Sequence, residues 1–98
     1  MTVTLVAELG INHQGDLNIA RKMIDATKQA GWDAVKVQNY RTSEFLPAGH
    51  PDWTLFEQAE IGAHLTSLCQ YAHNRGLLFG TTPASSRGVH EAVDAGVD

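Results

Sequence analysis

Two kinds of hydrophobic pattern alternate along the chain. Short apolar and β-branched runs of the kind that form buried strands occur at residues 2–9, 34–38 and 77–81. Apolar residues at helical spacing follow the first run, between Asp16, which suits a helix N-cap, and Gly31, which suits the position just past a helix end. This alternation of strand and helix predicts an α/β fold with a parallel sheet and right-handed crossovers.

A long polar connection follows the second predicted strand. Residues 39–53 are rich in turn-forming residues, and connections of this length are often functional. The sequence Thr54-Leu55-Phe56-Glu57 matches a capping box, so a short helix is predicted to begin there and to be interrupted at Gly62. One face of the next helix, which ends before Gly76, is then formed by Ile61, Leu65, Leu68 and Ala72.

The last predicted helix spans about residues 86–95 and has Gly96 as its cap. Its apolar positions are Val89, Ala92 and Val93. Gly96-Val97-Asp98 has the same form as Gly31-Trp32-Asp33, which leads into the second strand, so a further strand is expected beyond residue 98. Because a complete (β/α)8 barrel needs about 250 residues, residues 1–98 are expected to be the incomplete N-terminal portion of such a barrel, namely three βα units.

Composition excludes several classes of function. The formal net charge is −4, whereas a nucleic-acid surface would be basic. The single cysteine, Cys69, excludes a disulfide framework and a cysteine-rich zinc site, so we expect it in the core and the protein in the reducing cytoplasm. No apolar run approaches the roughly 18 residues of a membrane span, and the first residues lack the basic start of a signal peptide. Neither nucleic acid nor membrane is therefore an expected partner.

Polar residues stand near the carboxyl ends of the predicted strands, where α/β barrels place their active sites. These residues are Glu8, Lys36, Gln38, Thr81 and Thr82. Because side chains alternate along a strand, Lys36 and Gln38 share a face that points into the barrel mouth, while Val35 and Val37 face the helices. A lysine inside a parallel strand needs a partner, which is either an anionic ligand or Glu8.

These residues also have a purely structural interpretation. In that interpretation Lys36 and Glu8 form an ion pair that ties two strands together, and Thr81-Thr82-Pro83 forms a turn. In the functional interpretation the two threonines hold a carboxylate or phosphate, together with Ser85-Ser86 at the next helix start. His13 is expected in a loop near the mouth. No histidine pair has metal-ligand spacing, so this segment alone predicts no metal site.

Three motifs resemble those of the sialic acid synthase family. The first, Ala7-Glu8-Leu9-Gly10-Ile11-Asn12-His13-Gln14-Gly15, is similar to that family's A-E-x-G-x-N-H-x-G. The second, Ala30-Gly31-Trp32-Asp33-Ala34-Val35-Lys36-Val37-Gln38, is similar to A-G-A-D-A-V-K-x-Q. The third, Phe79-Gly80-Thr81-Thr82-Pro83, is similar to F-x-S-T-P. The three motifs have the family's order and spacing, and together they cover essentially the whole chain.

This resemblance implies an aldolase-type TIM barrel that condenses phosphoenolpyruvate with N-acetylmannosamine, its 6-phosphate or a related N-acylamino sugar. The family's products are a nonulosonic acid, such as N-acetylneuraminic acid, and phosphate, and a divalent metal, Mn²⁺ or Mg²⁺, activates the sugar aldehyde. By the same resemblance, Lys36 and Thr82 bind phosphoenolpyruvate. Glu8 is the catalytic residue that faces the sugar, and Gln38 lies beside the sugar and the metal. Weaker candidates for binding are Thr81, Asn12 and His13.

The chain also departs from the family pattern. Ala84 stands where family members often have Phe, and the loop over residues 39–53 is short for the family. The family's metal-ligating histidines lie on later strands, and its C-terminal antifreeze-like domain, which reaches the partner's active site in a homodimer, is absent from residues 1–98. We therefore expect this segment alone to bind no metal and to catalyse no reaction.

Two other functions fit the same residues. In a different barrel enzyme, an aldolase-type lyase, Lys36 would form a Schiff base with a keto acid. In a non-catalytic truncated fragment, exposed strand edges would lead to association with another chain.

Overall fold

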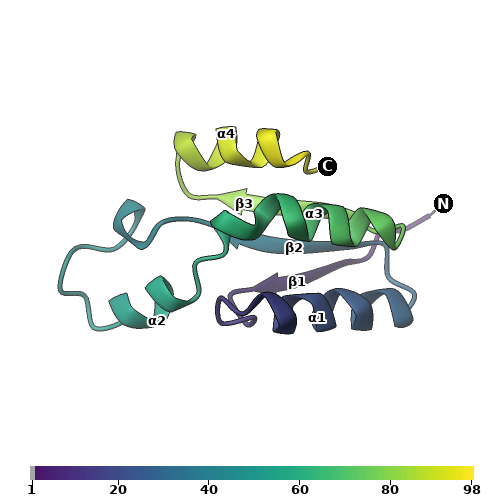
Figure 1. Cartoon of the computed structure of the whole chain (residues 1–98), viewed down its shortest axis with the longest axis horizontal. Helices are drawn as coiled ribbons and strands as arrows, with labels where there is room; N and C mark the ends of the chain where they lie inside the picture. The colour runs from purple at the N-terminus through teal and green to yellow at the C-terminus, as the bar shows by residue number, and fades with distance from the viewer. Residues whose placement is uncertain (1) are drawn as a thin grey trace.

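The computed structural model describes residues 2–98 and contains the predicted alternation of strands and helices (Figure 1). Its parallel sheet has the strand order β1-β2-β3, formed by β1 (Val6–Gly10), β2 (Ala34–Asn39) and β3 (Leu78–Pro83). Its α-helices are α1 (Leu17–Gln29), α2 (Trp53–Gln58), α3 (Leu65–Asn74) and α4 (Ser86–Ala95). Two short 3₁₀ helices, η1 (Thr42–Glu44) and η2 (Gly62–His64), lie in the long connection between β2 and α3. The α/β class and the parallel pairing are thereby confirmed.

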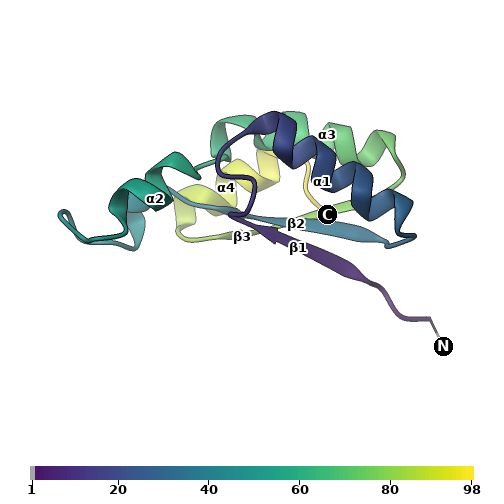
Figure 2. The same ribbon diagram turned by 90° about the horizontal axis from the view of Figure 1, so that it is seen from below.

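Helices α1, α3 and α4 cover one face of the sheet and leave the other face bare (Figure 2). The core lies between the helices and the sheet, and its largest fully buried apolar side chains are Ile24, Val35, Val37, Ile61, Leu65, Leu68 and Phe79. On the bare face, Val6 and Leu78 are about half exposed. A sheet face without helices suits the inside of a barrel, which other strands would have to complete.

The first helix begins and ends where its sequence signals predicted. The Asp16 carboxylate accepts hydrogen bonds from the backbone N–H groups of Asn18 at 2.8 Å and Ile19 at 3.2 Å, which makes Asp16 the N-cap of α1. Gly31 follows the end of α1 with a φ of 78°, in the left-handed region that favours glycine. Gly76 and Gly96 end α3 and α4 in the same conformation.

Two local predictions were wrong. The first strand was expected from residue 2, but β1 begins at Val6, because the ladder starts where Val6 lies opposite Ala34 on β2. The capping box at Thr54 does not form. Helix α2 already begins at Trp53, and Glu57 accepts a hydrogen bond from the Trp53 indole at 3.2 Å instead of serving as a cap.

The two helices that follow the long connection match their predictions more closely. Ile61, Leu65, Leu68 and Ala72 are all buried on one side, as expected, and Cys69 lies in the core beside them. Helix α4 spans the predicted residues, but only Ala92 of its three named apolar positions is buried. Val89 and Val93 are exposed, because α4 lies at the β3 side of the molecule with no further element over its outer surface in residues 2–98 (Figure 1).

Candidate functional site

Four polar residues named from the sequence lie together on the bare face of the sheet, at the carboxyl ends of the strands. Parallel pairing places Glu8 of β1 opposite Lys36 of β2, and the same row continues to Gly80 of β3. The next row pairs Gln38 of β2 with Thr82 of β3. Because residues in register share a face, these four side chains form one polar surface, while Val35 and Val37 are fully buried on the helix side.

The centre of this surface is an ion pair between Lys36 and Glu8. The Lys36 Nζ lies 3.2 Å from Glu8 Oε2, and the two side chains are 38% and 46% exposed. The other carboxylate oxygen, Oε1, accepts a hydrogen bond from the Gly10 backbone N–H at 2.7 Å, which fixes the orientation of Glu8. An ammonium group has three N–H donors, so one carboxylate partner leaves donors for an anionic ligand.

The two neighbouring threonines have different environments. Thr81 points to the helix side of the sheet, where its hydroxyl donates a hydrogen bond to the Val37 carbonyl at 3.0 Å. Thr82 is exposed on the polar surface beside Gln38. Of the pair, Thr82 is therefore placed to meet a ligand, whereas Thr81 supports the pairing of β2 with β3.

The loop after β1 places its two candidates differently. Asn12 is exposed, but His13 is fully buried and accepts a hydrogen bond from the Gly15 backbone N–H at 2.9 Å through Nδ1. Burial lowers the pKa of His13, so the ring is neutral near pH 7. His13 therefore orders the loop from inside and does not present a charged group to the polar surface.

An apolar pocket that the sequence did not predict adjoins the polar surface. It has a volume of about 120 Å³ and lies where β2 and β3 end, lined by Ile11, Gln38, Tyr40, Phe45, Phe56, Thr82, Pro83 and Ala84. Its three aromatic rings contact one another edge to face, with centroids 5.1 Å apart for Tyr40 and Phe45 and for Phe45 and Phe56. The Tyr40 hydroxyl donates a hydrogen bond to the Phe56 carbonyl at 2.7 Å, which joins the start of the long connection to α2.

Hydrogen bonds from Arg87 and Ser85 to Glu44 hold the long connection against α4. Arg87 donates to both carboxylate oxygens of Glu44, at 2.9 and 3.0 Å, and this bidentate pair joins η1 to the first turn of α4. Ser85 also donates to Glu44, and it accepts a hydrogen bond from the Gly88 N–H as the N-cap of α4. Hydrogen bonds from Arg87 and Ser85 lower the pKa of Glu44 to about 2. Ser85 is therefore engaged in fixing the loop, rather than in the expected anion site.

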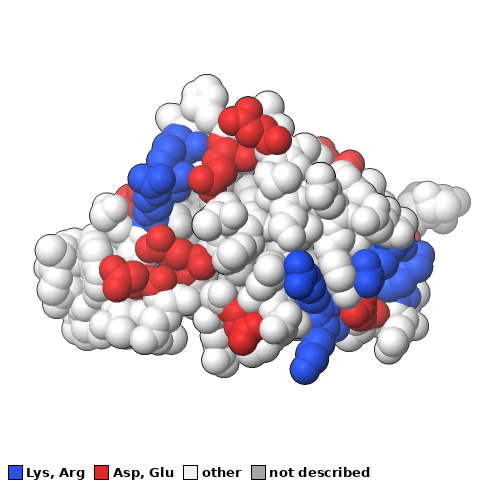
Figure 3. Space-filling view, viewed as in Figure 1, with Lys and Arg blue, Asp and Glu red and all other residues white. Residues whose placement is uncertain are grey.

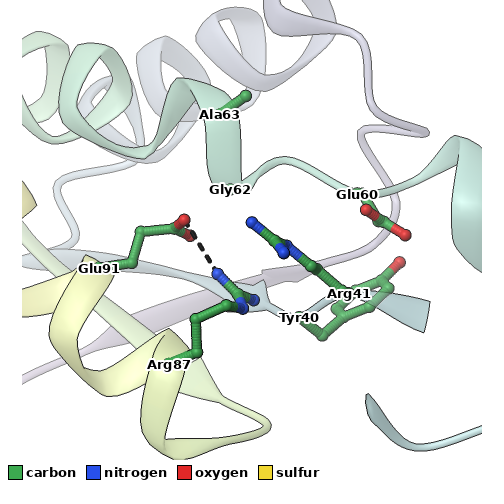
Figure 4. A pocket seen from close by; sticks show the side chains of 7 residues that line it. All are labelled: Tyr40, Arg41, Glu60, Gly62, Ala63, Arg87 and Glu91. Carbon is green, nitrogen blue, oxygen red and sulfur yellow. Dashed lines mark hydrogen bonds and ion pairs between the residues drawn. The ribbon is translucent and has the colours of Figure 1, made fainter. Parts of the chain in front are cut away.

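A second cavity of about 300 Å³ lies between α4 and the segments on either side of α2 (Figure 4). Its lining residues are Tyr40, Arg41, Glu60, Gly62, Ala63, Arg87 and Glu91. Arg87 donates to Glu91 at 3.0 Å, and Glu60 accepts from both the N–H and the hydroxyl of Thr42. The two arginines and two glutamates give this lining no net charge. The spacing of Arg87 and Glu91, four residues apart on one helix, is the sequence signal that would have found that pair.

Charges on the rest of the surface are mixed. In Figure 3, basic and acidic side chains lie in small neighbouring groups on the face shown, and no basic patch extends across it. Across residues 2–98, no three His, Cys, Asp or Glu side chains gather closely enough to hold a metal ion. Within that same part of the chain, none of the helices has the length and apolar character needed to cross a membrane.

Comparison with known proteins gives matches that cover only part of each relative. No protein-family model matches the chain. The uncharacterized protein MJ1065 of Methanocaldococcus jannaschii is 34% identical over 80 residues, which are 81% of this chain and 24% of that protein. The N,N'-diacetyllegionaminic acid synthase of Legionella pneumophila is 46% identical over 46 residues, which are 47% of this chain and 13% of that enzyme.

A solved structure matches the fold almost throughout. The crystal structure of N-acetylneuraminic acid (sialic acid) synthetase from Leptospira borgpetersenii, in complex with citrate, superimposes with a TM-score of 0.93 at 31% identity. This match covers 99% of the present chain and 34% of that one. The chain therefore spans about a quarter of the archaeal relative and about a third of the Leptospira enzyme.

Proposed function

We propose that this chain, a member of the sialic acid synthase family, provides the phosphoenolpyruvate-binding strands of an enzyme that makes a nonulosonic acid. In this proposal β1, β2 and β3 are three of the eight strands of an aldolase-type TIM barrel, and the bare face of the sheet lines the barrel interior. The names and fold of the relatives support the family, and their greater length supports a larger catalytic unit.

The observation that carries the proposal is the row of Glu8 and Lys36 next to the row of Gln38 and Thr82 on that face. The ammonium of Lys36 would bind the phosphate or carboxylate of phosphoenolpyruvate through charge-assisted hydrogen bonds, and the Thr82 hydroxyl would donate a further one. Glu8, oriented by the Gly10 N–H, would accept a hydrogen bond from the reacting oxygen of the sugar. Gln38 would bind the sugar beside it.

The proposed reaction joins phosphoenolpyruvate to the aldehyde carbon of an open-chain N-acylamino sugar. The double bond of phosphoenolpyruvate attacks that carbon, water adds to the resulting cation, and phosphate leaves by C–O cleavage. The family resemblance implies a divalent metal at the aldehyde, but residues 2–98 contain no cluster of ligands that fits one. We therefore assign metal binding to none of these residues, and the roles of Lys36, Thr82 and Glu8 do not depend on it.

The test measures phosphate release from phosphoenolpyruvate and N-acetylmannosamine by the full-length enzyme, of which residues 1–98 are the proposed N-terminal part, and by its Lys36→Gln variant. Removing one charge-assisted hydrogen bond from a bound anion costs about 1.5–3 kcal/mol, so we expect the KM for phosphoenolpyruvate to rise roughly 10- to 100-fold. Lys22→Gln, which removes an exposed lysine of α1 on the helix side, is the matched control and should change neither KM. Equal KM values for Lys36→Gln and the unsubstituted protein would contradict the assignment.

Borohydride trapping separates the proposal from a Schiff-base lyase. In the proposed role Lys36 holds an anion through hydrogen bonds and forms no covalent bond with the substrate, whereas in a Schiff-base lyase the lysine nitrogen is joined covalently to the keto acid. We therefore expect borohydride reduction in the presence of pyruvate to leave Lys36 unlabelled. Mass-spectrometric detection of a reduced adduct on Lys36 would favour the lyase instead.

Residues 1–98 by themselves are expected to release no phosphate.

A further inference from the structure

The roles assigned to the polar surface do not account for the apolar pocket at the ends of β2 and β3. Two of its lining residues, Gln38 and Thr82, belong to the polar surface, so the pocket and that surface are continuous. The remaining lining is aromatic or aliphatic, apart from the Tyr40 hydroxyl, which is already hydrogen-bonded to the Phe56 carbonyl. A ligand bound at Gln38 and Thr82 would therefore have apolar surface beside it.

The pocket is preformed and uncharged. Edge-to-face contacts among Tyr40, Phe45 and Phe56 fix the three rings against one another. Burial raises the pKa of the Tyr40 phenol to about 12, so the ring remains neutral at physiological pH. Phe45 is nevertheless 44% exposed, which leaves apolar surface that a ligand could cover. A mostly apolar lining with a few polar groups at one side is typical of a small-molecule binding site.

The size of the pocket is set in part by Ala84. Ala84 directly follows β3 and lines the pocket together with the three aromatic residues, and its own side chain is a single methyl group. The volume of about 120 Å³ has room for a short alkyl chain. A larger side chain at position 84 would take up the space that such a chain would use.

We propose that this pocket binds the alkyl part of the N-acyl group on the acceptor sugar, and that Ala84 determines how long that group can be. The inference rests on the proposed function, in which Gln38 lies beside the sugar. With the acyl amide at Gln38, the alkyl chain extends between Ala84 and the rings of Phe45 and Phe56. Each methylene moved from water into the pocket should lower the KM for the acceptor about fourfold, until the pocket is full.

The test measures the KM for a series of acceptors by phosphate release, with the full-length enzyme of which residues 1–98 are the proposed N-terminal part. N-acetyl-, N-propanoyl- and N-butanoylmannosamine differ only by successive methylene groups, so the KM for the acceptor should fall along the series. In Ala84→Phe this gradient should disappear or reverse, with the KM for phosphoenolpyruvate unchanged. Ala84→Ser preserves the size of the side chain and should keep the gradient. Because Ala84 is exposed, the larger side chain can be accommodated without refolding of the core.

A binding measurement gives a second, independent readout. In saturation-transfer NMR, irradiation of the aromatic protein protons should reduce the signal of the terminal methyl group of N-butanoylmannosamine. We expect this for the unsubstituted protein and for Ala84→Ser, but not for Ala84→Phe. If phosphate is released but the KM for the acceptor is the same for all three N-acylmannosamines, this inference is refuted and the proposed function stands. The same holds if the KM falls along the series in Ala84→Phe as it does in the unsubstituted protein. Absence of phosphate release with every acceptor would refute the proposed function and this inference with it.

Discussion

A pair of alanine substitutions, at Gly15 and Gly31, tests how the loop after β1 is held in place. Both glycines have a left-handed backbone, with φ of 75° at Gly15 and 78° at Gly31. They differ in their surroundings. A Cβ on Gly15 would lie 2.0 Å from the carbonyl oxygen of Gln58, at the end of α2, whereas a Cβ on Gly31 would meet no described atom within 4 Å.

The two substitutions therefore share one cost and differ in another. A left-handed backbone costs a non-glycine residue about 1–2 kcal/mol, and both variants incur that cost. Gly15→Ala must in addition displace backbone by roughly an ångström or more, and overpacking of this kind costs about 1–3 kcal/mol. The effect of alanine on the unfolded chain is similar at both sites and cancels in the comparison. We expect Gly31→Ala to lower the free energy of unfolding by about 1–2 kcal/mol and Gly15→Ala by about 2–5 kcal/mol.

Urea denaturation of the purified protein and the two variants measures this difference. The midpoint should fall in both variants at constant m-value, and further in Gly15→Ala. If the two variants lose the same free energy within about 0.5 kcal/mol, the loop that carries Ile11 and His13 does not pack against the end of α2. In that case Ile11 would also lose its place in the wall of the apolar pocket.

Three further predictions concern caps, packing and charge. Asp16→Ala should lower the free energy of unfolding by about 1 kcal/mol, and Asp16→Asn by only a few tenths, because asparagine keeps the cap; urea midpoints measure both. A Cβ on Gly62 would lie 2.6 Å from Glu91 Oε1 and 2.9 Å from Oδ1 of the buried Asn39, so Gly62→Ala should cost about 1–2 kcal/mol; in a Glu91→Ala background only the Asn39 clash remains and the cost should be smaller, as a double-mutant cycle would show. The pKa of Glu44 falls from its ordinary value of 4.5 to about 2, so its pairing with Arg87 contributes stability that is complete above about pH 4.5 and is lost towards pH 2. The Glu44→Gln variant should therefore be less stable than the unsubstituted protein at pH 7 and lose less stability on acidification. Urea midpoints that fall equally with pH in both proteins would contradict this.

Features written in short stretches of sequence could be predicted. The spacing of Asp16 and Gly31 around a periodic apolar segment specifies α1, because caps and helical faces depend on residues a few positions apart. The alternation of Val35, Lys36 and Val37 specifies which side of β2 faces the helices, because the period of a strand is two. Glu8 was one of the two partners considered for Lys36, and the parallel register of β1 and β2 places the two residues side by side.

Features that need distant segments to meet could not be predicted in this way. Glu44 and Arg87 are 43 residues apart, and neither has a neighbour in sequence that indicates the other. The apolar pocket likewise combines residues at the ends of β2 and β3 with Ile11 from the loop after β1 and with Phe45 and Phe56 from the long connection. The false capping box at Thr54 shows the opposite case. There a correct local pattern was overridden, because Trp53 already forms the start of the helix and engages Glu57.

The Lys36–Glu8 pair fits both the structural and the ligand-binding interpretation, and its exposure decides which experiment distinguishes them. An ion pair whose side chains are 38% and 46% exposed contributes at most about 1 kcal/mol to stability. A role as a tie between β1 and β2 would therefore be a weak one, since the backbone ladder between these strands is already formed. Lys36→Met keeps the length of the side chain and removes the charge, so it should change the free energy of unfolding by less than about 1 kcal/mol. If the same variant also binds phosphoenolpyruvate as well as the unsubstituted protein does, the lysine serves neither purpose, and the polar surface loses its central ligand-binding group.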